Sequence, residues 1–253
     1  MTAARRKQRI LEMTGQGQEC SVHELADQFD VSEMTVRRDL ADLADQGRIV
    51  RTHGGAAPAS GVMFEFRFLN RVHENRSEKD EIARVAGEMV NDGDTVILDS
   101  GTTTLILSET LRAKKNLSIV TTSLPVASKL QYCDNIDVVL LGGRLRHDVP
   151  DLMGALTLRN LQEVRADTAF IGADAIDEDG VVYNKSIELA HLLQTMSEAA
   201  EQVYIVADSS KLHGTALAKI GTLTEWSGLI TDNSASEKML QRLRKNGVDL
   251  FLE

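Results

Sequence analysis

The sequence has few of the residues on which several classes of protein depend. Its two cysteines, Cys20 and Cys133, are far apart and form no Cys-x-x-Cys motif, which argues against a disulfide framework or a structural zinc site. Three prolines and no compositionally biased tract argue against long disordered segments. No apolar run approaches the ~18 residues that span a bilayer, and the first residues, MTAARRKQRILEM, contain cations but no apolar signal core. We therefore expect a cytoplasmic protein with no membrane partner.

Positive charge is also scarce, because 28 Lys and Arg stand against 38 Asp and Glu, a net charge of −10. Residues 1–57 contain eight Lys or Arg and nine Asp or Glu, a net charge of −1, and the remaining residues hold −9. The N-terminal region can bind phosphate only if its cations gather on one face, as Arg5–Arg9, Arg37–Arg38 and Arg48–Arg51 could. An acidic remainder repels DNA, so a homodimer or homotetramer that engages several half-sites would compensate.

Residues 21–40, SVHELADQFDVSEMTVRRDL, have the pattern of two short helices joined by a tight turn. Apolar residues recur at helical spacing in the first helix at Val22, Leu25, Ala26 and Phe29. Asp30 and Val31 form the connection, and Ser32 is a good N-cap for the second helix. The second helix buries Val36 and Leu40. Its other side has a polar first turn and two adjacent arginines, which is typical of a helix that enters a major groove.

A small hairpin is expected directly after this pair. Leu43 continues the apolar stripe of the second helix, and Gly47 is placed to end it. Residues 48–56, RIVRTHGGA, place two β-prone residues between cations and end at a glycine pair, which is typical of a wing that reaches phosphate or the minor groove. The predicted DNA-binding residues are Ser32, Glu33, Met34, Thr35, Arg37, Arg38, Arg51, His53 and Gly54. The alternative is an amphipathic helix pair whose charged residues are merely solvated.

This segment resembles the DNA-binding domain of DeoR-type bacterial transcription regulators. The matching residues are the S-x-x-T-V-R-R-D-L run from Ser32 to Leu40 and the H-G-G-A run from His53 to Ala56. The resemblance extends from about Arg6 to Leu252. It implies a winged helix-turn-helix domain that binds double-stranded operator DNA.

We expect a winged helix-turn-helix domain at 1–57, a linker at 58–75 and an effector-binding sensor domain at 76–253. Small residues at 56–61 (AAPASG) mark the boundary. Phe64, Phe66 and Phe68 then alternate with charged residues, which is consistent with an extended segment or with rings that dock a connecting helix.

Short Val/Ile/Leu runs alternate with helical patterns through the rest of the chain. The expected strands are 95–98, 117–121, 136–141, 168–171, 202–208, 228–231 and 248–252. The expected helices are 103–112, 124–130, 156–163, 186–200 and 237–246, after a first helix that opens at 77–80. Unbroken apolar strands between helices predict an α/β domain whose parallel strands are covered on both faces.

Polar and small residues follow five of these strands. Ligands of open α/β sheets bind beyond the carboxyl ends of the strands, and a glycine-containing loop with hydroxyls at a helix N-terminus suits a phosphate. Lys211 adds a cation suited to a phosphate, and Asp99 and Asp174 could hold sugar hydroxyls. The alternatives are that these residues cap helices and that Lys211 is a solvated loop lysine.

This region resembles the DeoR-type sensor domain, which is similar in fold to ribose-5-phosphate isomerase and CoA-transferase-like domains. The matching runs are D-S-G-T-T at 99–103, T-x-S-L at 121–124, G-G-x-x-R at 142–146, A-F-I-G at 169–172 and D-S-S-K at 208–211. The resemblance implies a phosphorylated sugar or related metabolite as effector, with the 100–104 loop and Lys211 at its phosphate. The predicted effector residues are Asp99, Ser100, Gly101, Thr102, Thr103, Thr104, Thr121, Thr122, Gly142, Gly143, Asp174, Asn184, Glu188 and Lys211.

The chain also departs from the family pattern. The helix after Asn184 contains Glu188 followed by His191 and Leu192, where the family often has a cation after the acid. The residue after the D-S-S-K run is Leu212 rather than the usual Phe. These changes concern the identity of the effector more than the fold.

Two classes of function remain open from the sequence. The first is a repressor of a carbohydrate-utilisation operon that the effector releases, with activation or a protein partner as weaker variants of the same class. The second is a sugar-phosphate isomerase-like enzyme with an appended DNA-binding domain, for which Asp174, Glu188 and Lys211 offer acid–base groups. The sequence contains no Ser-His-Asp order, metal-ligand spacing or cofactor fingerprint, so we expect no catalytic residues, metal or cofactor.

Overall fold

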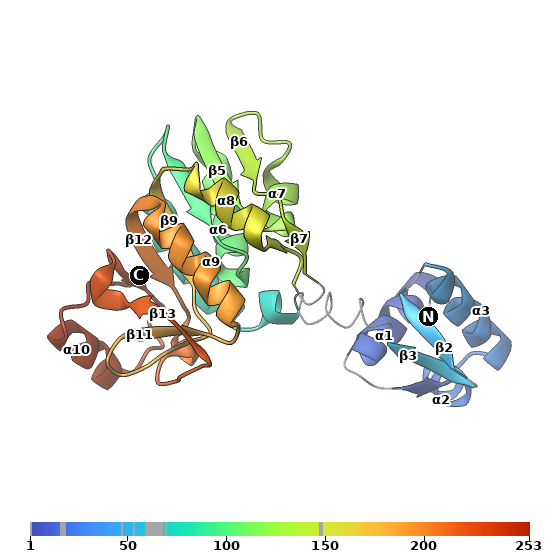
Figure 1. The fold of residues 1–253 in the computed structure, drawn as a ribbon. Coiled ribbons are helices and arrows are strands. Elements are labelled where there is room, and N and C mark those ends of the chain that lie inside the picture. Colours follow the sequence, from blue (N-terminus) through green and yellow to red (C-terminus); the bar gives the residue numbers. More distant parts are fainter. Residues whose placement is uncertain are drawn as a thin grey trace. The chain divides into compact units, whose positions relative to one another are not determined.

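The computed structural model describes residues 2–15, 19–46, 48–52, 54–58, 68, 70–146 and 149–253. The chain divides into two compact units, one that runs to Arg71 and one that starts at Val72. Figure 1 shows the elements of each unit. No described helix is both long and apolar enough to cross a membrane.

The N-terminal unit combines helices with a small antiparallel sheet. Its elements are α1 (Ala3–Gly15), β1 (Cys20–Ser21), α2 (Val22–Phe29), α3 (Glu33–Asp45), β2 (Ile49–Thr52) and β3 (Gly55–Pro58). The strands pair in the order β1-β3-β2, so the predicted hairpin is present and has a third strand that the sequence did not indicate. Apolar residues from all three helices, among them Ile10, Leu25 and Leu40, meet in one buried core.

The C-terminal unit is built on a seven-stranded parallel sheet with the order β15-β14-β12-β9-β4-β5-β6. These strands are β4 (Thr95–Leu98), β5 (Leu117–Thr121), β6 (Ile136–Leu140), β9 (Ala166–Gly172), β12 (Ala200–Val206), β14 (Gly228–Ile230) and β15 (Leu250–Phe251). Each of the seven apolar runs identified in the sequence forms one strand of this sheet. The predicted α/β domain is therefore confirmed.

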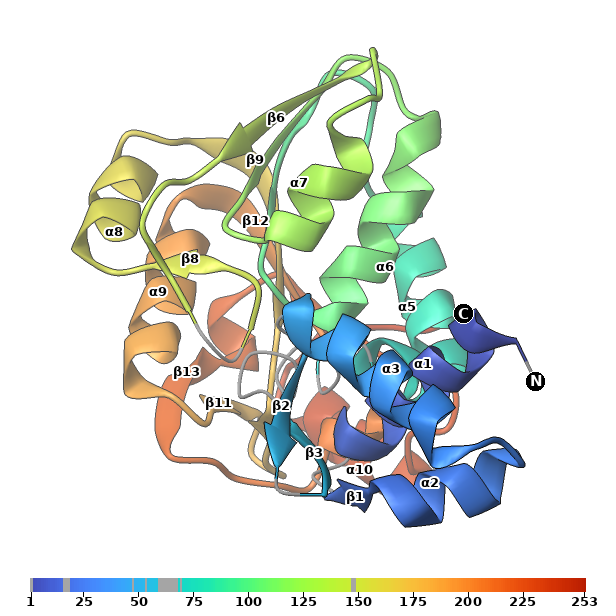
Figure 2. The same cartoon turned by 90° about the vertical axis from the view of Figure 1, so that its right-hand side faces the viewer.

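Helices cover both faces of the sheet. On one face lie α5 (Arg76–Glu88), α6 (Thr102–Thr110) and α7 (Leu124–Leu130), and on the other lie α8 (Ala155–Gln162) and α9 (Ile187–Glu198), as Figure 2 shows. Met239 and Leu243 of α10 (Glu237–Lys245) belong to the same core cluster as the buried residues of α9. Because α6 packs against α5, α7 and the sheet, its residues from Thr103 to Ser108 are all buried.

Several features differ from the sequence-based expectations. A second antiparallel sheet of β10 (Ala175–Ile176), β11 (Val181–Asn184) and β13 (Ala218–Thr222), and a pairing of β7 (Arg144–Leu145) with β8 (Leu152–Met153), were not expected. The strand β6 is an edge strand, and Val139 and Leu140 are more than one-third exposed, so it is not covered on both faces.

The segment expected to be a linker is only partly described. Pro58 ends β3, and residues 70–73 are helical. Phe68 is helical and buried, whereas Phe64, Phe66 and Gly47 lie outside the described residues. The boundaries that we place at 58 and 75 stay a prediction.

Candidate functional site

Caps define both ends of α2 and the start of α3. The Ser21 hydroxyl accepts the Glu24 amide at 3.2 Å, and the Glu24 carboxylate accepts the Ser21 amide at 3.0 Å, which forms a capping box at the start of α2. The Ser21 hydroxyl also donates to the Glu24 carboxylate at 2.7 Å, and this bond, followed by the one from the Ser21 amide, lowers the pKa of Glu24. Asp30 ends α2 in the left-handed region with φ 52°. Ser32 then caps α3 by accepting the Thr35 amide at 3.2 Å, as the sequence predicted.

The outward face of α3 presents one apolar side chain between charged ones. Glu33, Met34, Arg37 and Arg38 are all exposed. The Arg37 guanidinium lies 3.3 Å from the Glu33 carboxylate, whereas Arg38 forms no ion pair with any described residue. The charge of Arg38 acts only at longer range on the Asp42 carboxylate, whose pKa it helps to lower after the larger effect of Lys7. Arg38 therefore presents a cation that is in no close ion pair among the described residues, which is the group that a DNA phosphate needs.

The inward face of α3 contains an acid that the sequence analysis did not assign. Asp39 is buried with Val36, Leu40 and Leu43, and its carboxylate accepts a hydrogen bond from Arg6 Nε at 2.8 Å. Lys7 similarly lies 2.6 Å from Asp42. Two of the cations that we expected to gather for phosphate are thus neutralised within the unit. The expectation that Arg5–Arg9 could gather with Arg37–Arg38 and Arg48–Arg51 on one phosphate-binding face is therefore corrected for Arg6 and Lys7.

The hairpin exposes Arg51 on β2, and Gly54 adopts φ 132° in the turn. A Cβ atom on Gly55 would lie 2.0 Å from the Cys20 carbonyl oxygen, so the pairing of β3 with β1 requires glycine at this position. The structure thus accounts for the glycine pair of the motif. His53, which we also predicted to contact DNA, lies outside the described residues.

In the C-terminal unit most of the predicted effector residues lie just after the carboxyl ends of strands of the parallel sheet, whereas Asn184 ends β11 and Glu188 lies in α9. The sequence order of these strands is β4, β5, β6, β9 and β12, but in the sheet they are contiguous as β12-β9-β4-β5-β6. The polar ends that we identified separately therefore share one edge of the sheet. Counted from β15, these five strands are the third to the seventh, so the predicted site extends from the middle of the sheet to the edge strand β6.

Asp99 fastens two of these strand ends together. Its Oδ1 accepts bonds from the Gly101 amide at 2.8 Å and the Thr104 hydroxyl at 2.6 Å, and its Oδ2 accepts the Gly172 amide at 2.7 Å. Burial raises the pKa of Asp99, and the nearby Asp151 carboxylate raises it further, against the lowering effect of the three bonds. The contacts made by Asp99 are those of a residue that holds the 99–104 loop in place. The predicted role of Asp99 in binding sugar hydroxyls stays a prediction, because these contacts are all made within the chain.

Ser100 is also occupied within the chain. Its hydroxyl donates to Asp151, and Asp151 accepts two further bonds from Arg146, with Nε–Oδ1 at 2.6 Å and Nη2–Oδ2 at 2.8 Å. Asp151 is fully buried, so this bidentate pair compensates a charge that would otherwise be costly. Sequence reasoning missed Asp151, and only the arginine of the G-G-x-x-R run gave a signal.

The threonines at the strand ends differ in their availability. Thr104 is buried and bonded to Asp99, Thr103 is buried, and Thr102 is half-buried at the start of α6. Thr121 Oγ1 accepts the Ser123 amide at 3.1 Å. Thr122 Oγ1 is buried and has no hydrogen-bond partner among the described residues. An unpaired buried hydroxyl is unfavourable until a ligand or water satisfies it.

The two glycines and the later polar residues of the predicted set have partners within the chain. The Gly142 carbonyl accepts the Thr157 hydroxyl at 2.7 Å, and a Cβ on Gly143 would lie 2.1 Å from Thr157 Oγ1. Asp174 accepts the Lys185 amide at 2.9 Å, and Asn184 accepts the Ser186 amide at 2.9 Å. Glu188 is exposed and lies 3.3 Å from Arg144. These contacts lie within the chain and stabilise its fold. Helix α9 contains no Lys or Arg, and Arg144 is the cation that pairs with Glu188.

Lys211 follows β12 in the 3-10 turn Ser209–Lys211. It is half-buried and makes no hydrogen bond or ion pair through its side chain within the described ranges. A half-buried lysine whose side chain has no carboxylate partner among the described residues is suited to an anionic ligand.

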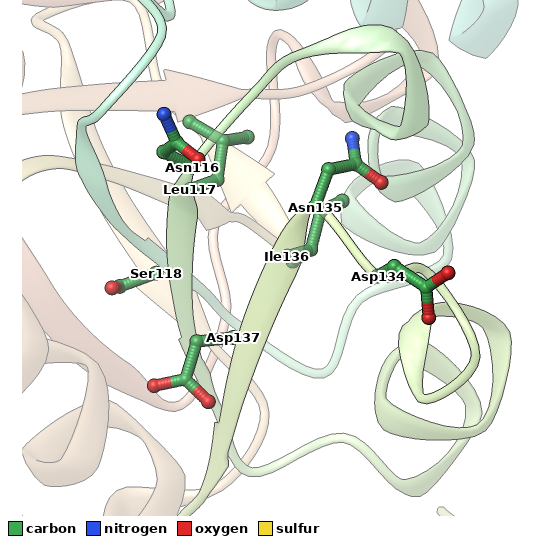
Figure 3. Close-up of a pocket in the computed structure, with 7 residues that line it drawn as sticks. All are labelled: Asn116, Leu117, Ser118, Asp134, Asn135, Ile136 and Asp137. Atoms are coloured by element: carbon green, nitrogen blue, oxygen red, sulfur yellow. The ribbon is translucent and has the colours of Figure 1, made fainter.

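A hollow of the C-terminal unit lies at the other edge of the sheet. Figure 3 shows that residues around the amino ends of β5 and β6 line it, namely Asn116, Leu117, Ser118, Asp134, Asn135, Ile136 and Asp137. It is open and polar, and none of these seven residues is cationic. The lining is therefore unsuited to a phosphate, and this hollow is distinct from the predicted effector edge.

Comparison with known proteins agrees with both units. The sequence profile of the DeoR-like helix-turn-helix domain matches residues 6–61, and that of the DeoR C terminal sensor domain matches residues 74–233. The HTH-type transcriptional repressor CsqR of Escherichia coli is 31% identical, with 100% of this chain and 96% of that protein aligned. The glycerol-3-phosphate regulon repressor of the same species is 32% identical over 100% of both chains.

Solved structures give a weaker likeness. Ribose 5 phosphate isomerase A from Neisseria gonorrhoeae is 23% identical over 53% of this chain and 54% of its own, with a TM-score of 0.38. A similarity of this size assigns no activity. The two domain profiles and the full-length relatives do identify the protein: the chain belongs to the DeoR family of DNA-binding transcriptional regulators.

Proposed function

We propose that this protein represses a carbohydrate-utilisation operon and does so as a homodimer or homotetramer in the cytoplasm. The observation that carries the proposal is the outward face of α3, where Arg37 and Arg38 are exposed beside a capped first turn. Such a turn would meet base edges while the guanidiniums bind phosphates. Because the chain has a net charge of −10, a single half-site would be bound weakly, and two or more linked half-sites would compensate.

The DNA-binding set would comprise the exposed residues of α3 and of the hairpin. Ser32 and Thr35 would act mainly through the cap that they form, because their hydroxyl oxygens lie 2.9 Å apart at the start of the helix. Arg51 and Gly54 would approach the backbone of the duplex from the hairpin, with His53 beside them in sequence.

The effector in this proposal is a phosphorylated sugar bound at the carboxyl edge of β12-β9-β4-β5-β6. The support is the N-terminus of α6 at Thr102 together with the ammonium of Lys211 and the hydroxyl of Thr122, neither of which has a partner among the described residues. A helix N-terminus and a cation favour a phosphate, and an unpaired hydroxyl favours a hydrogen-bonding sugar. Asp174, Asn184 and Glu188 would form the sugar side of the site.

Release of DNA requires that the effector bind two arrangements of the protein unequally. A ligand with equal affinity for the DNA-binding arrangement and the released one would shift nothing. The experiment is fluorescence anisotropy of an operator duplex, titrated with the protein in the presence of a panel of phosphorylated sugars. Each unphosphorylated sugar and inorganic phosphate serve as controls. At least one sugar phosphate should lower operator affinity, and no loss of affinity across the panel would contradict the induction step.

The same panel separates regulation from the enzymatic alternative. The family and the relatives' names indicate regulators, and the proposed effector should therefore be recovered unchanged after incubation with the protein. Turnover of ribose 5-phosphate or another member of the panel would instead favour an isomerase-like activity.

A further inference from the structure

Met34 is the most exposed apolar side chain that the described part of α3 contains, with 74% of its surface accessible. It is the second residue of the helix, directly after the Ser32 cap and Glu33. Because this large apolar side chain is exposed to water, its packing contributes little to the stability of its own unit. Its position is the one from which a groove-inserted helix reads bases.

The neighbouring side chains of the first turn are already engaged. The Glu33 carboxylate lies 3.3 Å from Arg37 and 3.7 Å from His23. The Thr35 hydroxyl lies 2.9 Å from that of Ser32. Met34 is thus the member of this turn whose side chain is both fully outward and free of polar contacts within the described chain.

Arg37 and Arg38 are three and four residues after Met34, so the three side chains share one face of the helix. This face presents one apolar side chain beside two cations. It is therefore complementary to a groove that is bordered by anionic groups and has an apolar group on one of its bases. The major groove has this combination where phosphates border a thymine.

The chemistry of the thioether narrows what it can recognise. A methionine side chain has no hydrogen-bond donor and only a weak acceptor, so it cannot read the polar edges of guanine, adenine or cytosine. The one apolar group that bases present in the major groove is the C5-methyl of thymine. A flexible, unbranched side chain adapts well to such a contact.

We propose that Met34 is a specificity-determining residue that contacts the C5-methyl group of thymine in the operator. This inference rests on the proposed DNA-binding function and adds the class of base that the first turn of α3 selects. Glu33, held by Arg37 and His23, would then act as a positioning residue for the cationic side of the face rather than as a base reader.

The test is removal of single methyl groups from the DNA. In an operator duplex obtained by selection, each thymidine is replaced in turn by deoxyuridine, which keeps base pairing and loses only the methyl group. The wild-type protein should lose about fourfold in affinity at one or two positions of each half-site, the effect of one buried methyl group. Met34→Ala should bind the thymidine duplex less well and be insensitive to deoxyuridine at those same positions. Met34→Leu, which stays apolar, should retain the sensitivity.

Three outcomes separate the inference from the proposed function. Equal affinity of the wild type for all deoxyuridine duplexes would overturn the role of Met34 while leaving DNA binding intact. Unchanged sensitivity in Met34→Ala would also overturn it, because another residue would then make the contact. Failure of the wild-type chain to enrich any duplex in the selection would contradict the proposed function itself.

Discussion

Arg6 on α1 and Asp39 on α3 form a buried ion pair, with Nε and Oδ2 2.8 Å apart and both residues less than one-tenth exposed. Asp39 directly follows Arg37 and Arg38 in sequence, yet its side chain points inward while theirs point outward. Three consecutive residues of α3 therefore supply both the surface proposed for DNA and the contact that fixes the helix to α1.

Replacing Arg6 with alanine should weaken the N-terminal unit substantially. The change leaves the Asp39 carboxylate buried without its partner, which typically costs about 3–5 kcal/mol. Hydrogen exchange of the full-length chain measures this locally, and amides of α1 and α3 should exchange at least ~100-fold faster. Arg9→Ala, which removes an exposed pair with Glu12 at 2.8 Å, is the matched control and should have little effect. Similar exchange in both variants would show that the buried pair does not fix α3.

Alanine at Arg38 should weaken operator binding more than alanine at Arg37. Arg38 has no described ion-pair partner, whereas Arg37 must give up its contact with Glu33 when it binds phosphate. Loss of one phosphate contact should also reduce the slope of log affinity against log salt concentration by about 1. Arg159→Ala, an exposed cation on α8, makes the same change in net charge and serves as control. Unchanged affinity and slope in Arg38→Ala would remove this residue from the interface.

Lys211→Ala should impair the response to a sugar phosphate without changing operator affinity in its absence. A charge-assisted hydrogen bond contributes about 1.5–3 kcal/mol, so the effector concentration for half-release should rise roughly 10- to 100-fold. Lys211→Arg should recover part of this response because it keeps the charge. Lys245→Ala, an exposed lysine at the end of α10, should respond as the wild type does. A normal response in Lys211→Ala would place the phosphate elsewhere.

Asp99 should make the C-terminal unit less stable as pH rises. Burial raises the pKa of Asp99 in the folded state, so between the unfolded and folded pKa values the unfolded chain has lost a proton that the folded chain retains. Stability from this group is therefore present below the unfolded pKa and falls as pH rises through the folded one, by at most about 1.4 kcal/mol per pH unit.

The comparison with Asp99→Asn isolates this effect. Asparagine cannot ionise, so the stability of the wild type relative to the variant should decline from about pH 4 upward. The fluorescence of Trp226, the one tryptophan of the chain, reports urea unfolding of the C-terminal unit. A difference between the two proteins that stays constant with pH would contradict the raised pKa.

The sequence predicted those features that rest on local pattern. The seven apolar runs became the strands of the parallel sheet, and Ser32 capped α3 as its spacing indicated. The order of these strands in the sheet brings the polar residues after them to one side of the sheet. That grouping was expected only from the general behaviour of α/β folds. The antiparallel strands β10 and β7 are two residues long and leave almost no pattern to recognise.

Contacts between distant residues could not be predicted in the same way. Arg6 and Asp39 are 33 positions apart, and Ser100 and Asp151 are 51 apart. In sequence Asp39 is one more charge on an amphipathic helix, and Asp151 follows a segment with no periodicity. Asp39 is buried because α1 packs against α3. Asp151 is buried next to β8, where the chain pairs with β7.

Selection of bound duplexes from a random DNA library tests the central claim most directly, when the full-length chain and its Arg37→Ala/Arg38→Ala variant are compared in parallel. The outward face of α3 predicts that the wild type enriches a defined sequence with repeated half-sites and that the double variant enriches none. Equal enrichment by the two proteins, or no enrichment by the wild type, would contradict the assignment of this face to DNA.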